Sequence, residues 1–67
     1  MTLADYIEAG HKTMEELSAE SGVSYMTIKK ARRGYKISKY EKAKALSDAT
    51  KPSPDAEPMV TVEELCE

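Results

Sequence analysis

Cationic side chains are concentrated in one short stretch of this sequence, where they alternate with tyrosines. Eight of the ten lysines and arginines lie between positions 29 and 44, and Glu41 is the one acidic residue there, so the stretch carries a charge of +7. Tyr35 and Tyr40 lie within it, and Tyr25 lies just before it. Closely spaced ammonium and guanidinium groups attract the phosphates of nucleic acids. The pattern therefore indicates a phosphate-binding surface.

The rest of the chain is acidic, which hides this stretch in the total composition. Residues 1–28 carry a charge of −4 and residues 45–67 carry −5, so the net charge is only −2. A folded chain with this layout presents positive charge in acidic surroundings. The position of the charge, rather than its total, predicts a polyanionic partner.

Side chains for catalysis or metal binding do not occur together in the sequence. The one cysteine, Cys66, and the one histidine, His11, lie far apart, so they predict neither a disulfide nor a metal site. Adjacent acidic pairs such as Glu15 and Glu16 point along different faces of a helix. No Ser/His/Asp set or glycine-rich phosphate loop is present. We expect no enzyme, cofactor, bound metal or small-molecule substrate.

The 67 residues suffice for one small domain with a modest core, a size at which pairing of two copies often adds stability. No stretch approaches the roughly 20 apolar residues that span a bilayer. The start lacks the charged and apolar regions of a secretory signal. We therefore expect a cytoplasmic protein without membrane contact.

Capping residues followed by apolar positions three and four apart predict four helices within residues 1–49. The first is a supporting helix that begins after Thr2 and stops at Gly10. The second begins with the capping-box spacing of Thr13 and Glu16, and the third, over 25–33, follows a Ser24 cap. Ser38 and Glu41 repeat the capping-box spacing and open a fourth helix to about residue 49, with Ile37, Tyr40, Ala43 and Leu46 turned inward.

The second and third helices are separated only by Gly22, Val23 and Ser24, as in a helix-turn-helix. Glycine supplies the positive φ of such a turn, and Val23 would plug the junction. Small or apolar residues stand wherever the two helices would touch, at Met14, Leu17, Ser18, Gly22, Val23, Ile28 and Ala31. The expected fold is an all-α, compact four- to five-helix bundle containing this motif.

Residues 50–58 hold three prolines and predict a mobile linker between the helix-turn-helix domain, 1–49, and a C-terminal segment, 59–67. In that segment, alternation at Val60 and Val62 suits a strand, whereas Thr61 and Glu64 suit a capped helical turn, which we favour. Val60, Val62 and Leu65 have no further domain to bury them. The segment either pairs two copies of the chain or folds back over the first helix.

The stretch from Thr13 to Gly34, T-M-E-E-L-S-A-E-S-G-V-S-Y-M-T-I-K-K-A-R-R-G, resembles the helix-turn-helix of phage Cro and repressor proteins, the XRE family. The resemblance continues through residues 37–38 and 43–46, and residues 60–65 look like the tail of small Cro-like proteins. Met14 stands where the family usually has Gln, and Ser21 where it usually has an apolar residue. The resemblance implies a lambda-repressor-like fold.

By this resemblance, helix 25–33 lies in the major groove of DNA. Met26 and the Thr27 methyl would touch a thymine methyl, and Lys29 would donate to guanine O6 and N7. The candidates for contact with base edges are Tyr25, Met26, Thr27, Lys29, Lys30 and Arg33. The candidates for contact with phosphate lie around the loop and at helix starts, and are Lys12, Met14, Tyr35, Lys36 and Lys39.

The implied function is sequence-specific binding of double-stranded DNA by a Cro-like phage or prophage repressor, a transcription regulator on the nucleoid of a bacterial host. A homodimer is expected at least on the operator DNA; the sequence leaves open whether the free protein pairs and whether it represses or activates. Two other interpretations stay open. One is an antitoxin-like DNA binder that holds a toxin through its acidic tail, and the other is a helix-turn-helix adapted to bind proteins.

Overall fold

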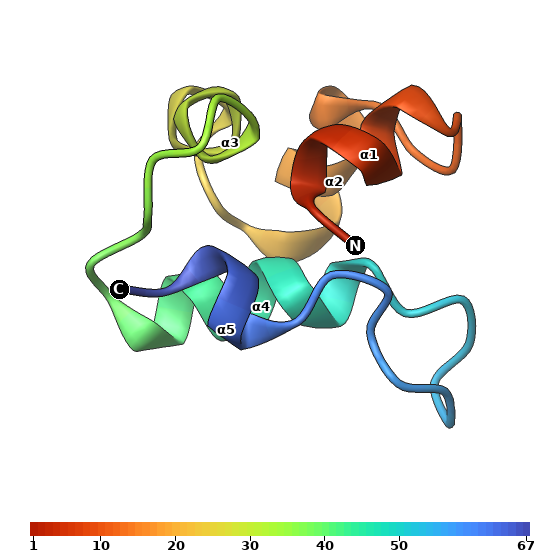
Figure 1. Cartoon of the computed structure of the whole chain (residues 1–67). Helices are drawn as coiled ribbons and strands as arrows, with labels where there is room; N and C mark the ends of the chain where they lie inside the picture. Colours follow the sequence, from red (N-terminus) through yellow and green to blue (C-terminus); the bar gives the residue numbers. More distant parts are fainter.

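The structure, a computed structural model, describes all 67 residues as an all-helical fold, which confirms the predicted class. It contains five α-helices and no strand: α1 (Leu3–Glu8), α2 (Met14–Ser21), α3 (Tyr25–Arg32), α4 (Tyr40–Ala49) and α5 (Val62–Leu65). Figure 1 shows α1, α2 and α3 on one side of the molecule and α4 with α5 on the other. None of these helices has the length and the apolar run that a membrane span requires.

The first three helices begin where the sequence predicts, because a hydroxyl caps each of them. Thr2 Oγ1 accepts a hydrogen bond from a first-turn N–H at 3.1 Å. Thr13 and Glu16 form both bonds of a capping box, at 3.1 and 3.2 Å. Ser24 Oγ accepts from Thr27 N at 3.3 Å. Each cap satisfies a backbone N–H that has no partner within its helix.

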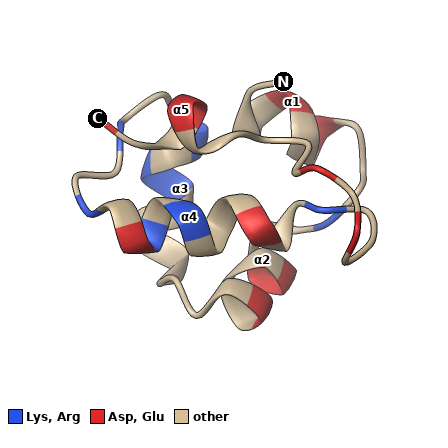
Figure 2. Ribbon diagram, turned by 90° about the horizontal axis from the view of Figure 1, so that it is seen from below, with Lys and Arg blue, Asp and Glu red and all other residues tan.

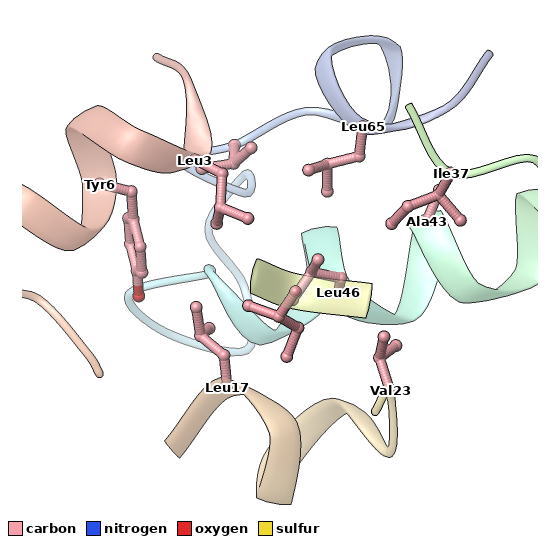
Figure 3. Packing of buried hydrophobic residues seen from close by; sticks show 10 residues of the cluster. Leu3, Tyr6, Leu17, Val23, Ile37, Ala43, Leu46 and Leu65 are labelled. Carbon is pink, nitrogen blue, oxygen red and sulfur yellow. The ribbon is translucent and has the colours of Figure 1, made fainter. Parts of the chain in front are cut away.

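The start of α4 differs from the prediction. No capping box forms at Ser38 and Glu41; the N-cap is Lys39, which makes no side-chain cap bond. Tyr40, predicted to face the core, has 59% of its surface exposed. Ile37 is buried in its place and lies near Ala43 in Figure 3. Because Ile37 already fills the core at this end of α4, the tyrosine ring stays in solvent.

One core holds the helices together (Figure 3). α2 packs against both α3 and α4, and α5 packs against α4. The buried apolar side chains are Leu3, Tyr6, Leu17, Val23, Ile28, Ile37, Ala43, Leu46, Val60 and Leu65. The two halves of the chain therefore share a single hydrophobic core.

The C-terminal segment folds back into this core. Val60 is fully buried and Leu65 is 2% exposed, while Val62 is half-buried. The segment contains a short helix, as favoured above, and an isolated parallel bridge joins Cys66 to Ile37. The segment folds back onto the domain, but its helix packs against α4 and not, as predicted, over the first helix. Val60 and Leu65 are not free to pair two copies of the chain.

Two hydroxyls attach this segment to the end of α4. Ser47 Oγ donates to Val60 O at 2.7 Å, Val60 N donates to Thr50 Oγ1 at 3.1 Å, and Thr50 Oγ1 donates to Ser47 O at 2.6 Å. All three residues are buried, so these bonds satisfy polar groups that water does not reach. Thr50, expected to begin a mobile linker, is therefore part of the core, and the connecting loop begins after it.

Thr50→Val is expected to lower the free energy of unfolding by about 1–3 kcal/mol, because it leaves the buried Val60 N–H without an acceptor. Urea unfolding followed by circular dichroism measures this loss. Thr61→Val is the matched control, since Thr61 is exposed and its hydroxyl makes no cap bond. The control should change the free energy by less than about 0.5 kcal/mol. Equal losses in both variants would contradict the role given to Thr50.

Candidate nucleic-acid interface

α2 and α3 form a helix-turn-helix around a three-residue turn. Gly22 has φ +74°, a left-handed conformation that favours glycine. Val23 is buried beneath the turn. Ser18 Oγ donates to Val23 O at 2.7 Å, and Val23 N donates to Ser21 Oγ at 3.1 Å. Ser21 thus holds the turn by hydrogen bonding instead of packing as an apolar residue would.

α3 buries one side and exposes the other. Ile28 is fully buried, and Ala31 is half-buried against the core. The exposed side chains of α3 and its C-cap are Tyr25, Met26, Lys29, Lys30, Arg32 and Arg33. Because residues three and four apart share a helix face, Met26, the two lysines and Arg33 form one outward stripe.

Thr27 is the least accessible of the predicted base-facing residues. It is half-buried, and its Oγ1 lies 2.8 Å from Ser24 Oγ. The two hydroxyls share a hydrogen bond at the start of α3. The Thr27 hydroxyl is therefore already paired within the protein.

The cations of residues 29–44 are all exposed, and none of them forms an ion pair. The two ion pairs of the structure are Lys12–Glu20 at 2.9 Å and Lys51–Asp48 at 3.5 Å. Figure 2 shows cations on α3, on the segment after it and on α4, which also carries Glu41 and Asp48. The helices α1, α2 and α5 carry acidic residues and no cations. These eight exposed cations, which we call the basic surface, extend from α3 through the following segment to α4 on the other side of the molecule (Figure 1); they are Lys29, Lys30, Arg32, Arg33, Lys36, Lys39, Lys42 and Lys44.

Lys12 does not belong to the basic surface. Its Nζ donates to Glu20 Oε1 at 2.9 Å and to Ala49 O at 2.8 Å, and its side chain is 23% exposed. The ammonium group therefore joins α2 to the C-terminal end of α4. Since this charge is used within the molecule, we withdraw Lys12 from the predicted phosphate contacts.

The segment between α3 and α4 presents the other predicted phosphate contacts to solvent. Tyr35 is 62% exposed, and Lys36 and Lys39 are exposed as well. Tyr40 follows directly and adds a second exposed ring, although the sequence predicted that it faces the core. The charged residues on either side of it, Lys39 and Glu41, indicate in the sequence that this part of the chain faces water.

The C-terminal tail fixes the position of that segment. Lys36 Nζ donates to Glu64 O at 2.8 Å. Ile37 N donates to Leu65 O at 2.6 Å, and Glu67 N donates to Ile37 O at 3.1 Å. Backbone groups of the tail thus hold the segment that carries Lys36. The pattern of side chains in the sequence does not predict these bonds.

The N-terminus of α2 is poorly suited to the phosphate contact predicted at Met14. The Met14 side chain is half-buried against the core, so only its backbone N–H is available to an anion. Glu15 and Glu16 lie in the first turn, and their negative charge opposes that of a phosphate. Any anion contact here is weaker than on the basic surface.

Other reactive side chains do not gather into a site. No group of three or more His, Cys, Asp or Glu residues lies close enough to hold a metal ion. His11 stacks on Tyr6, with ring centroids 5.1 Å apart. Burial raises the pKa of the Tyr6 phenol above its usual value, so this hydroxyl stays neutral. Tyr6 is therefore part of the core, and the exposed His11 ring lies against it.

No protein-family model, curated protein or solved structure matches the chain. The site is a helix-turn-helix whose second helix exposes Met26 and a set of cations without ion pairs.

Proposed function

We propose that the chain binds double-stranded DNA in a sequence-specific manner, with α3 in the major groove. The basic surface carries this proposal, because its eight cations are exposed and without ion pairs. No existing ion pair has to break before these side chains meet phosphates, and only Lys36 gives one of its hydrogen bonds to a backbone carbonyl, of Glu64. The major groove admits an α-helix and displays a distinct pattern for every base pair.

In this arrangement the outward stripe of α3 faces the base edges and the adjoining segment faces the backbone. Met26, Lys29 and Lys30 stand in the N-terminal and central part of α3, where base contacts concentrate. Tyr25 and Arg33 flank them. Tyr35, Lys36 and Lys39 contact phosphates, which set the register of the protein on the duplex without reading sequence.

The corresponding biological role is that of a Cro-like repressor with a lambda-repressor-like arrangement, which occupies an operator in the cytoplasm and blocks transcription. Two copies on a palindromic operator would place their α3 helices about 34 Å apart. Because Val60 and Leu65 are buried in each copy, the pairing surface must lie elsewhere than on these tail residues.

Selection of bound sites from a pool of random duplexes, followed by footprinting, tests the proposal. We expect one motif to be enriched and protected. Single-stranded DNA and RNA of the selected sequence are the controls, because exposed tyrosines also stack on unpaired bases. Equal affinity for the single strands, or a pool that does not enrich, would refute the proposal. Failure to bind any duplex would favour the protein-binding alternative.

Substitution of single lysines separates sequence reading from phosphate contact. Lys29→Ala is expected to weaken the selected site by about 5- to 150-fold relative to random duplex, the equivalent of losing one base contact. Lys39→Ala should weaken both DNAs alike. Lys51→Ala is the matched control, since it removes the same charge from a residue paired with Asp48. Titrations followed by fluorescence anisotropy measure all three. Parallel losses for Lys29→Ala and Lys39→Ala on both DNAs would show that α3 does not read bases.

A further inference from the structure

A cleft of about 300 Å³ lies between the start of α1, the end of α3 and the C-terminal tail. Its apolar wall consists of two buried and two half-buried side chains, Leu3, Leu65, Ala4 and Ala31. Arg32, Arg33 and Lys36 also line it. The cleft therefore combines an apolar wall with three cations, and its volume is at the lower end of the range for small-molecule sites.

The cations of this cleft are not neutralised by acidic neighbours. Glu64 is the one acidic residue in the lining, and none of the four charged residues forms an ion pair. Lys36 Nζ donates to Glu64 O at 2.8 Å, so it bonds to the backbone of that residue and not to its carboxylate. Three cations and one anion give the lining a net charge of +2.

Arg32 is the cation of α3 that does not lie on the outward stripe. It follows Ile28 by four residues and so lies on the same side of the helix, and Ile28 is fully buried. Arg32 therefore leaves α3 at the edge of the core, where it lines the cleft together with Leu3 and Ala4 of α1. Its side chain is exposed and forms no ion pair, so its charge is free to meet a ligand in the cleft.

These features suit a small organic phosphate. A guanidinium group binds phosphate oxygens through two parallel hydrogen bonds, and an ammonium group adds a point charge. A phosphate monoester carries a charge of about −1.5 to −2 at pH 7, which matches the net charge of the lining. Each phosphodiester of DNA carries a single charge. The apolar wall would cover the organic part of the ligand, which removes apolar surface from water.

We propose that this cleft binds a small phosphate monoester, with the phosphate between Arg32, Arg33 and Lys36 and the organic part against the apolar wall. Arg33 and Lys36 also contact DNA under the proposed function. A ligand in the cleft neutralises both of them, and DNA binding then weakens. This competition rests on the proposed function, whereas the ligand site itself does not.

Chemical shifts of the backbone amides test the site in the protein without DNA, with phenyl phosphate as the probe. We expect saturable shifts at Ala4, Arg32 and Lys36. Methyl phenyl phosphate is a diester of similar shape with a single charge, like a DNA phosphate, and should bind about fivefold more weakly. Equal affinity for the diester, or equal shifts at Lys42 and Lys44, would indicate general attraction to the basic surface and overturn the proposal.

Two substitutions change the cleft in different ways. Arg32→Gln removes a cation and should weaken the binding of phenyl phosphate about tenfold. Ala4→Leu places a larger side chain in the cleft and should weaken it to a similar extent. Circular dichroism verifies that both variants are folded. Because Arg32 is exposed, its substitution tests the site even if Ala4→Leu impairs folding.

Each of these variants has a matched control outside the cleft. Lys44→Gln removes an exposed cation from α4, and Ala19→Leu enlarges an exposed position of α2. Neither control should change the affinity for phenyl phosphate. Losses in the controls as large as those in the cleft variants would overturn the proposal.

Anisotropy titrations with the selected duplex measure the competition. Phenyl phosphate at a saturating concentration should weaken binding of the duplex about tenfold, because two cations that meet DNA phosphates are then neutralised. Methyl phenyl phosphate at the same ionic strength is the control. Ala4→Leu should bind the duplex like the unsubstituted protein and should not respond to phenyl phosphate.

The two measurements separate this proposal from the proposed function. If phenyl phosphate shifts no amide of the cleft, the ligand site is refuted and sequence-specific DNA binding is unaffected. If the cleft is saturated and the affinity for the duplex stays the same, the competition is refuted. A pool of duplexes that yields no enriched site would refute the proposed function, and the amide shifts would still decide on the ligand site.

Discussion

A chain that ends at Pro58 is expected to be unfolded. The truncation removes Val60 and Leu65, two of the ten side chains of the core, and it also removes the partners of Ser47 and Thr50. Deleting one large core side chain costs about 2–5 kcal/mol. A domain of this size rarely has more than about 3–5 kcal/mol of stability in total. The loss therefore exceeds what the remaining core supplies.

Far-ultraviolet circular dichroism with a thermal melt measures this effect in the truncated and the full chain. Leu65→Ala tests the same burial without shortening the chain, and should lower the free energy of unfolding by about 2–5 kcal/mol. Glu63→Ala, at an exposed position of α5, is the matched control and should change it by less than about 0.5 kcal/mol. A cooperative melt of the truncated chain would show that the tail is dispensable to the core.

Affinity for duplex DNA is expected to fall about 500-fold when the salt concentration rises from about 50 to about 200 mM. Lysines and arginines that neutralise about five phosphates release their counterions, which gives a log–log slope of about −4.5. The basic surface offers eight exposed cations without ion pairs, so about five such contacts need only part of it. Anisotropy titrations across a salt series measure the slope.

Single substitutions show which cations contribute to that slope. Lys39→Ala should reduce its magnitude by about one contact. Lys51→Ala, which removes a cation outside the basic surface, should leave it unchanged. Tight binding with a slope near zero would rule out the electrostatic interpretation. An equal reduction in both variants would place the DNA elsewhere on the protein.

Local sequence by itself determined the first three helices and the turn between α2 and α3. A capping hydroxyl acts on an N–H within three residues of itself, so Thr13 and Ser24 specify helix starts without help from the rest of the chain. Gly22 supplies the left-handed residue that ends α2. Helical spacing likewise predicted that Leu17 and Ile28 are buried and that the cations of α3 face outward, because periodicity alone decides which face of a short helix is apolar.

Only the tertiary structure decided where Tyr40, Lys12 and the C-terminal tail lie. Ile37 and Tyr40 were both predicted to face the core, and the backbone bridge from Ile37 to the tail decided which of them is buried. Lys12 resembled a free cation until the packing of α2 on α4 brought the Ala49 carbonyl to it, 37 residues away.

The position of the tail could not be predicted for a similar reason. A pattern of apolar residues indicates that they are buried, but it does not indicate which surface of the protein covers them. The Ser47 and Thr50 hydroxyls and the tail backbone that holds Lys36 are contacts across 10 to 28 residues. Such contacts form only when distant segments of the chain pack together in one small core, so no local pattern in the sequence could predict them.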